Sequence, residues 1–261
     1  MTKGAVILAP HPDDECLMGL LPLRLKEECG FRIHVIPATL GSRTDRRAAR
    51  LRELRESCRR LGFRLEGGAT ARSGMQPADL ANRLGRLKPA VIFLPHVRDG
   101  HPTHQAVHRL GVAAMDAAPG GGWNVVETEY WHPLRQPNLM VIAGADHVAT
   151  LAEALNCHRG EMVRNDYAAR LPAWMIDNVR RGTERIVGMG AAAGAWTYAV
   201  LYRARRRMNS RWEMSVRGPR VVESSGDLGA WVQALPEAAG AAPSRPARKA
   251  TAAPMKSRKS G

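Results

Sequence analysis

The chain has 261 residues, of which 44% are hydrophobic and 24% charged, with a formal net charge of +15 at pH 7, values typical of one α/β domain with additions. Four widely spaced cysteines without a C-x-x-C pair argue against a disulfide framework and a cysteine zinc site. Because neither a signal-peptide pattern nor an apolar run of membrane-spanning length occurs, we expect a cytoplasmic protein.

The apolar pattern predicts strands and helices that alternate along the chain. In chain order we expect a strand over 4–9, a helix over 16–29, a strand over 31–40, helices over 46–63 and 77–87, a strand over 90–95, a helix over 105–117, strands over 124–131 and 138–144, and helices over 146–164 and 173–189. This alternation predicts an α/β fold with a mostly parallel sheet and helices on both faces.

Two polar clusters follow two of the predicted strands. The first is His-Pro-Asp-Asp-Glu over residues 11–15, which begins where the strand over 4–9 ends. The second follows the strand over 90–95 and contains His101, His104 and His108. Because ligands of such folds bind at the carboxyl ends of the strands, we expect the two clusters to meet at one edge of the sheet.

The residue types in these clusters suit a metal ion. His11 and Asp14 can face one cation around a tight turn, and a histidine from the second cluster would complete a set of two histidines and one carboxylate. Such a site keeps an open position, in which the ion lowers the pKa of water to roughly 7. Asp13 could then accept a proton from that water, and a spare histidine could protonate a leaving group or stabilise an oxyanion.

Purely structural roles suit the same residues. The segment HPDD is also typical of an Asx-type turn that caps the following helix, and His104 and His108 could simply share one helix face. The joint occurrence of both clusters after core strands favours the metal site over either structural role.

Three segments resemble the PIG-L/LmbE-like family of N-acetylglucosaminyl deacetylases, zinc enzymes with a Rossmann-like fold. APHPDDE after the first strand is similar to the family's signature, and GHPTHQAV resembles its second motif. The predicted helix over 46–63 is similar to a family helix that carries Arg, Glu three residues later, and then Leu-Gly. In this chain these residues are Arg50, Glu53 and the Leu-Gly pair at 61–62. The resemblance covers residues 4–165 and continues less clearly to residue 205.

The resemblance also implies roles for individual residues. The zinc ligands would be His11, Asp14 and His104, a set that also suits Fe²⁺ or Co²⁺. Asp13 would be the general base, and His101 would assist the tetrahedral intermediate or the departing amine. Arg50 is a candidate substrate-binding residue in the wall of the site.

The chain departs from the family pattern at two places. Thr103 stands where the family usually has Asp between the two histidines, so a hydrogen bond to a ligand histidine would lack charge. The loop TLGSRTDRR over residues 39–47 stands where relatives often carry Gly-Glu, which predicts altered substrate contacts.

The positive charge is divided between the body and the C-terminal end. Residues 236–261 hold six Lys or Arg and one Glu, a charge of +5, and their Ala/Pro/Lys-rich composition predicts a disordered tail. Residues 43–60 hold eight Arg against three acids, which we interpret as a solvated helix face. We therefore expect a deacetylase-like domain over 1–205, an extension over 206–235 and a basic tail over 236–261.

These patterns together predict a zinc-dependent hydrolase that removes an N-acetyl group from an amino sugar or glycoconjugate. The same site would suit another amide, such as one in a thiol conjugate or a secondary metabolite. An alternative from another class is a basic protein that binds nucleic acid or an acidic partner and carries a vestigial metal site. Because the two clusters are intact, we expect a small N-acetylated, sugar-containing substrate instead of nucleic acid, and no membrane-spanning segment.

Overall fold

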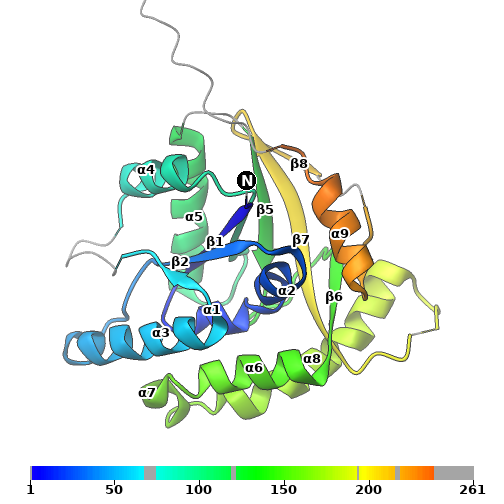
Figure 1. Ribbon diagram of the computed structural model, residues 1–261, viewed down its shortest axis with the longest axis horizontal. Coiled ribbons are helices and arrows are strands. Elements are labelled where there is room, and N and C mark those ends of the chain that lie inside the picture. Colours follow the sequence, from blue (N-terminus) through cyan, green and yellow to red (C-terminus); the bar gives the residue numbers. More distant parts are fainter. Residues whose placement is uncertain (1, 68–74, 119–121, 193, 215–217, 238–261) are drawn as a thin grey trace, which may run out of the picture.

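A computed structural model describes residues 2–67, 75–118, 122–192, 194–214 and 218–237 (Figure 1). Within them, one sheet has the strand order β3-β2-β1-β4-β5-β7-β6-β9, and β8 pairs with β7. The strands are β1 (Gly4–Ala9), β2 (Arg32–Pro37), β3 (Arg64–Leu65), β4 (Val91–Pro95), β5 (Gly122–Thr128), β6 (Leu139–Ala143), β7 (Tyr198–Met208), β8 (Arg211–Met214) and β9 (Val221–Val222). Strands β1 to β5 pair in parallel, which confirms the predicted α/β fold with a mostly parallel sheet.

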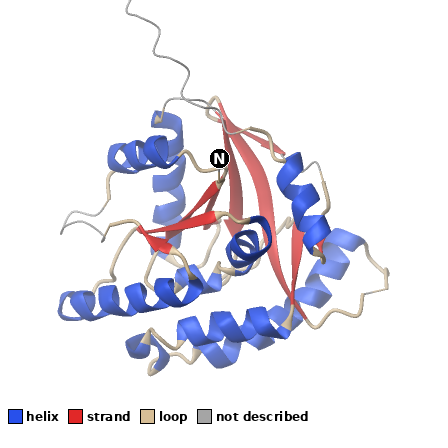
Figure 2. Cartoon of the chain, in the orientation of Figure 1, coloured by secondary structure: helices blue, strands red, loops and turns tan. Residues whose placement is uncertain are grey.

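Helices cover both faces of this sheet (Figure 2). The α-helices are α1 (Asp14–Leu17), α2 (Leu20–Cys29), α3 (Arg47–Leu61), α4 (Pro77–Leu87), α5 (Pro102–Ala117), α6 (Ala145–Leu155), α7 (Arg159–Met162), α8 (Tyr167–Gly182) and α9 (Ser225–Ala234). A 3₁₀ turn, η1 (Thr44–Arg46), precedes α3, and a π-helical turn, η2 (Thr183–Val187), follows α8. Among the described residues, no helix combines the length and the apolar character that crossing a membrane requires.

Alternate residues of each strand build a separate core on each face of the sheet. In β1, Ala5 and Ile7 belong to the larger core, to which α2, α3, α6, α8 and α9 contribute. Val6 and Leu8 belong to the core beneath α4 and α5. The sheet is therefore buried on both sides at β1, which explains why its sequence is continuously apolar.

The longest strand, β7, was not predicted from the sequence. Its 11 residues pair antiparallel with β5 on one side and with β6 on the other, so it lies inside the sheet. Val200 and Tyr202 face the larger core, whereas Arg203 and Arg205 alternate with them on the opposite face. Arginines at core-strand positions conceal a strand from a search for apolar runs.

The predicted helix over 16–29 is interrupted. It forms α1 and α2, separated at Gly19, where an added Cβ would lie 2.5 Å from the carbonyl oxygen of Glu15 and 2.9 Å from the side chain of Leu151. The region predicted as a helix over 146–164 forms α6 and α7, and that predicted over 173–189 forms most of α8 and η2.

The C-terminal residues of the described chain pack against the domain. The predicted boundary at residue 205 falls within β7, β9 pairs in parallel with β6, and Trp231 of α9 is buried in the larger core. The division into a domain, an extension and a tail stays a prediction, and residues 238–261 of the predicted tail lie outside the described residues.

Candidate active site

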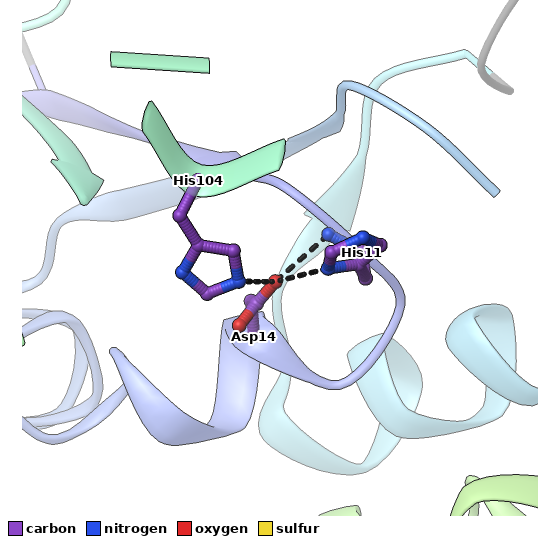
Figure 3. Close-up of side chains that lie close together, drawn as sticks. All are labelled: His11, Asp14 and His104. Carbon is purple, nitrogen blue, oxygen red and sulfur yellow. Dashed lines mark hydrogen bonds and ion pairs between the residues drawn. The ribbon is translucent and has the colours of Figure 1, made fainter. Parts of the chain in front are cut away.

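The two polar clusters meet at the carboxyl ends of β1 and β4. These strands are parallel neighbours, so the HPDDE turn after β1 lies beside the segment that leads from β4 into α5. Figure 3 shows the carboxylate of Asp14 between the imidazoles of His11 and His104. The sheet topology therefore brings together residues that are about ninety positions apart in the sequence.

The three side chains form a compact set of potential metal ligands. The ligand atoms of His11, Asp14 and His104 all lie within 4.8 Å of one another. Asp14 Oδ2 is 3.5 Å from His11 Nδ1 and 3.5 Å from His104 Nε2, and it accepts a hydrogen bond from the backbone N–H of His11 at 2.8 Å. Two imidazoles and one carboxylate fit a catalytic type of zinc site or a related divalent site.

Asp99 orients the histidines of the second cluster. This buried carboxylate lies 3.2 Å from His104 Nδ1 and accepts the backbone N–H of His101 at 2.8 Å. Because Nδ1 faces Asp99, His104 can present the lone pair of Nε2 towards Asp14 and a metal ion. The sequence interpretation missed Asp99; the signal was an acidic residue two positions before the first histidine of the motif.

Although Thr103 stands where the family usually has Asp, His104 has a charged partner in Asp99. The backbone N–H of Thr103 donates to His101 Nδ1 at 3.2 Å. Although burial lowers it, the carboxylates of Asp14 and Asp99 raise the pKa of His104 above its usual value. Burial and the nearby histidines His11 and His104 lower the pKa of His101, which keeps this imidazole neutral at neutral pH.

Asp13 and Asp14 are adjacent but have opposite electrostatic environments. Burial and the negative charge of Asp14 raise the pKa of Asp13 well above its usual value, with Arg50 opposing the shift. For Asp14, burial raises the pKa, but the two histidines His104 and His11 outweigh it and lower the pKa. Asp14 is thus held as a carboxylate ligand, while Asp13 is a carboxyl group that binds a proton more readily.

A buried network supports the backbone of Asp13. Asp13 has a φ of 120°, an unfavourable conformation for a residue with a Cβ, and its N–H donates to Glu15 Oε2 at 2.9 Å. Glu15 Oε1 accepts from Ser57 Oγ at 2.5 Å and lies 2.7 Å from His158 Nε2. Although Glu15, Cys16 and His158 also lie within metal-binding distance of one another, their polar groups are largely used in this network.

Arg50 lies in the wall of a cavity that His11, Asp14 and His104 also line. Its Nη2 donates to the carbonyl oxygen of Pro12 at 3.1 Å and lies 3.5 Å from Glu161 and 4.0 Å from Asp13. Glu161 therefore neutralises part of its charge and holds it beside the HPDDE turn. His108, also in the second cluster, lies outside this cavity, with Nδ1 2.9 Å from the carbonyl oxygen of Pro95.

We call the concave site the HPDDE cavity. Its volume is about 450 Å³, and it is lined by His11, Asp13, Asp14, Leu17, Thr39, Gly41, Ser42, Arg47, Arg50, His101, Thr103, His104, Trp131, Glu161, Arg164 and Tyr167. Trp131 is 45% exposed and packs edge-on against Tyr167, so two aromatic side chains contribute to the lining of the cavity. All six predicted site residues lie in the lining of this cavity.

The comparisons with known proteins agree with the motifs. Residues 6–115 match the family model described as PIG-L, GlcNAc-PI de-N-acetylase, and this range contains both polar clusters. No curated protein matches the chain.

Similar solved structures share the fold. The conserved protein TT1542 from Thermus thermophilus is 24% identical, with a TM-score of 0.57 and coverage of 77% of this chain and 94% of that chain. GalB, the 4-carboxy-2-hydroxymuconate hydratase from Pseudomonas putida KT2440, is 19% identical, with a TM-score of 0.60 and coverage of 86% and 99%. The N,N'-diacetylchitobiose deacetylase from Pyrococcus horikoshii is 15% identical, with a TM-score of 0.60 and coverage of 77% and 83%. The match over residues 6–115 confirms the resemblance to the PIG-L family that the motifs carry, and the similar structures share the fold.

Proposed function

We propose that the chain is a metal-dependent N-deacetylase with its active site in the HPDDE cavity. The observation that carries this proposal is the convergence of His11, Asp14 and His104 on the floor of a cavity that Asp13 and His101 also line. The family model and the deacetylase among the similar structures support an amide hydrolase.

The donor set fits a divalent transition metal. His104 has its Nδ1 engaged by Asp99 and its Nε2 directed at Asp14, as expected of a metal-binding imidazole. When bound, Zn²⁺, Fe²⁺ or Co²⁺ would act as a Lewis acid that polarises an amide carbonyl and makes water more acidic. His11, Asp14 and His104 would hold this ion.

Asp13 is suited to accept the proton of the attacking water. It lines the cavity next to Asp14, and its raised pKa makes its carboxylate a stronger base than an exposed aspartate. The positive charge of Arg50 opposes this increase in the pKa of Asp13.

His101 is suited to donate a hydrogen bond to the reacting amide. Its Nδ1 accepts the N–H of Thr103, so the neutral ring carries its proton on Nε2. A neutral imidazole with a proton on Nε2 can donate a hydrogen bond that stabilises negative charge on the carbonyl oxygen, while the proton that Asp13 accepts from water is available for the departing amine.

The lining of the cavity suits an N-acetylated sugar. Trp131 and Tyr167 present aromatic surface on which a pyranose ring can stack, and the polar side chains opposite can hydrogen-bond to its hydroxyl groups. Arg47 and Arg164 in the same lining suit an acidic substituent on the sugar or glycoconjugate.

Addition of water to a carbon–carbon double bond is a second candidate reaction. GalB, whose name states this kind of activity, aligns with 86% of this chain, and the arginines of the HPDDE cavity would suit a carboxylated substrate. The same acid–base residues would serve either reaction.

The test is acetate release from a panel of N-acetylated sugars and glycoconjugates, alongside a dicarboxylic enol as a hydratase substrate. We expect acetate release that a chelator abolishes and zinc or iron restores, and that His101→Ala reduces. Hydration of the enol without acetate release from any member of the panel would contradict the proposed deacetylase.

A further inference from the structure

A second cavity, larger than the first, lies beside residues 134–136, which contribute to its lining. Its volume is about 750 Å³, and its lining shares no residue with that of the HPDDE cavity. Its floor is formed by β5 and β7, where Glu127 stands opposite Arg203 in the strand register. It is a separate site, and Nε2 of His96 in its lining lies 2.8 Å from the carbonyl oxygen of His132.

The lining of this second cavity is strongly basic. Five arginines contribute to it: Arg98, Arg135, Arg185, Arg203 and Arg205. The single acidic residue of the lining, Glu127, pairs with Arg205. We call this site the arginine cavity.

Four of the five arginines lack an acidic partner. Within the described chain, Arg98, Arg135, Arg185 and Arg203 form no ion pair with a carboxylate; Arg203 contacts only the side-chain oxygen of Gln136, at 3.3 Å. Elsewhere in the described chain some arginines are paired, as in Arg60 with Glu153, and others, such as Arg52, form no ion pair. The arginine cavity therefore concentrates uncompensated positive charge.

The floor of the cavity also holds unused hydrogen-bond donors. The Nε atoms of Arg203 and Arg205 are buried without a hydrogen-bond partner. Burial lowers the pKa of Arg205, and the positive charges of Arg203 and Arg207 add to this effect, while Glu127 opposes it. An anion in the cavity would relieve the repulsion between neighbouring arginines.

We propose that the arginine cavity binds a small polyanion that carries two or more phosphate or carboxylate groups. Guanidinium groups bind both kinds of oxyanion through paired N–H donors. Exposed arginines at the rim, Arg98, Arg135 and Arg185, can contact one end of the ligand, while Arg203 and Arg205 contact the other end at the floor. The volume is within the range of small-molecule sites, whereas a cavity closed by a sheet floor does not suit a nucleic-acid duplex.

The test is calorimetric titration of the full chain with two weakly chelating probes, fructose 1,6-bisphosphate and tricarballylate. We expect one saturable site per chain for at least one probe, and the preferred probe identifies the phosphate or carboxylate class. Arg203→Ala and Arg185→Ala should each weaken binding about tenfold or more, since each removes charge-assisted hydrogen bonds. Arg203→Lys should restore part of the affinity at the floor.

Three controls separate binding in the arginine cavity from non-specific attraction, from binding in the HPDDE cavity and from misfolding. Arg86→Ala removes an exposed arginine outside the cavity and should leave the affinity unchanged. Asp14→Ala alters the proposed metal site and should also leave binding unchanged, so this test is independent of the proposed function. An unfolding temperature equal to that of the unaltered chain should accompany each variant that weakens binding.

Four results would overturn the proposal. The first is the absence of saturable binding of both probes, and the second is an equal loss of affinity in Arg86→Ala, which indicates non-specific attraction. The third is loss of binding in Asp14→Ala, which places the anion in the HPDDE cavity. Binding of a single-stranded oligonucleotide without binding of either small probe would replace the small polyanion with nucleic acid.

Discussion

At the scale of residues, the electrostatic environment of each carboxyl group determines whether it is suited to bind a metal ion or to accept a proton. Asp13 and Asp14 are chemically identical neighbours, but Asp14 contacts two imidazoles and Asp13 contacts neither. Burial and the charge of Asp14 raise the pKa of Asp13, whereas His104 and His11 lower that of Asp14. A pair of carboxyl groups with diverging pKa values is typical of a ligand beside a base.

We expect Asp13→Asn to separate catalysis from metal binding. The amide keeps the size of the side chain but cannot accept a proton, so kcat should fall by about 10²- to 10⁴-fold. The metal content should not change, because the ligand atoms belong to His11, Asp14 and His104. Acetate release and elemental analysis of the same sample check this, and a variant with full activity would show that Asp13 is not the base.

Asp99→Asn tests the orientation of His104. The amide can still accept the N–H of His101, but it loses the charge that faces His104 Nδ1. We expect a metal affinity about 10- to 100-fold lower, measured by competition with a chelator. Thr103→Val is the matched control, since it keeps the backbone N–H that contacts His101 and should leave the metal affinity unchanged. If Asp99→Asn binds the metal as tightly as Thr103→Val does, Asp99 is not the group that orients His104.

Glu15→Gln tests the network beneath the HPDDE turn. Glu15 accepts from Ser57 and from the N–H of Asp13 and lies beside His158, so an amide would direct a donor at a donor. We expect a loss of about 3 kcal/mol in the free energy of unfolding, measured with denaturant. Glu27→Gln, at a more exposed position on α2, should change it by less than about 0.5 kcal/mol. Equal stability of both variants would show that the network contributes little.

At the scale of elements, the apolar strands and the two motifs could be predicted from the sequence. The buried polar contacts that hold the first motif in place could not. β1 and β4 are continuous apolar runs, and their parallel pairing made the meeting of His11 and His104 predictable. The contacts of Glu15 with Ser57 and His158 join positions 42 and 143 residues apart, for which no local pattern exists. The arginines of β7 concealed that strand because they interrupt the apolar run by which a buried strand is recognised.

Arg24 joins α2 to β6 and β9 at one edge of the sheet. This buried side chain donates to the carbonyl oxygens of Ile142, Val222 and Glu223 and pairs with Glu28. We expect Arg24→Ala to lower the free energy of unfolding by about 3–5 kcal/mol, because several buried groups lose their partner. Lys26→Ala, on the same helix but with only a 3.7 Å ion pair to Glu27, is the control and should have little effect.

The pair of Arg24 and Glu28 also predicts a dependence of stability on pH. Although burial opposes it, hydrogen bonds from Arg24 and Ser225 lower the pKa of Glu28 below the usual glutamate value of 4.5. A lowered pKa in the folded state means that this stabilisation is present above pH 4.5 and is lost as the pH falls through the folded value. Denaturant unfolding between neutral and acidic pH should show a smaller acid-dependent loss in Glu28→Gln; an identical loss in both proteins would contradict this.

At the scale of the whole molecule, the sheet positions two sites of different character. The HPDDE cavity lies at the carboxyl ends of β1 and β4 and combines carboxylates, histidines and aromatic side chains. The arginine cavity lies over β5 and β7, and five of its ten lining residues are arginines. Part of the net charge of +15 is therefore concentrated at a defined cavity instead of being spread over a solvated surface.

The most direct test of the proposed active site is the metal content of the purified chain, measured by elemental analysis in the unaltered protein and in three variants. We predict about one zinc or iron per chain, lost in both Asp14→Ala and His104→Ala and kept in His147→Ala, a half-buried histidine on α6 outside the site. That result would show that two clusters from separate strands form one metal site. A metal-free protein, or metal retained in both ligand variants, would contradict it.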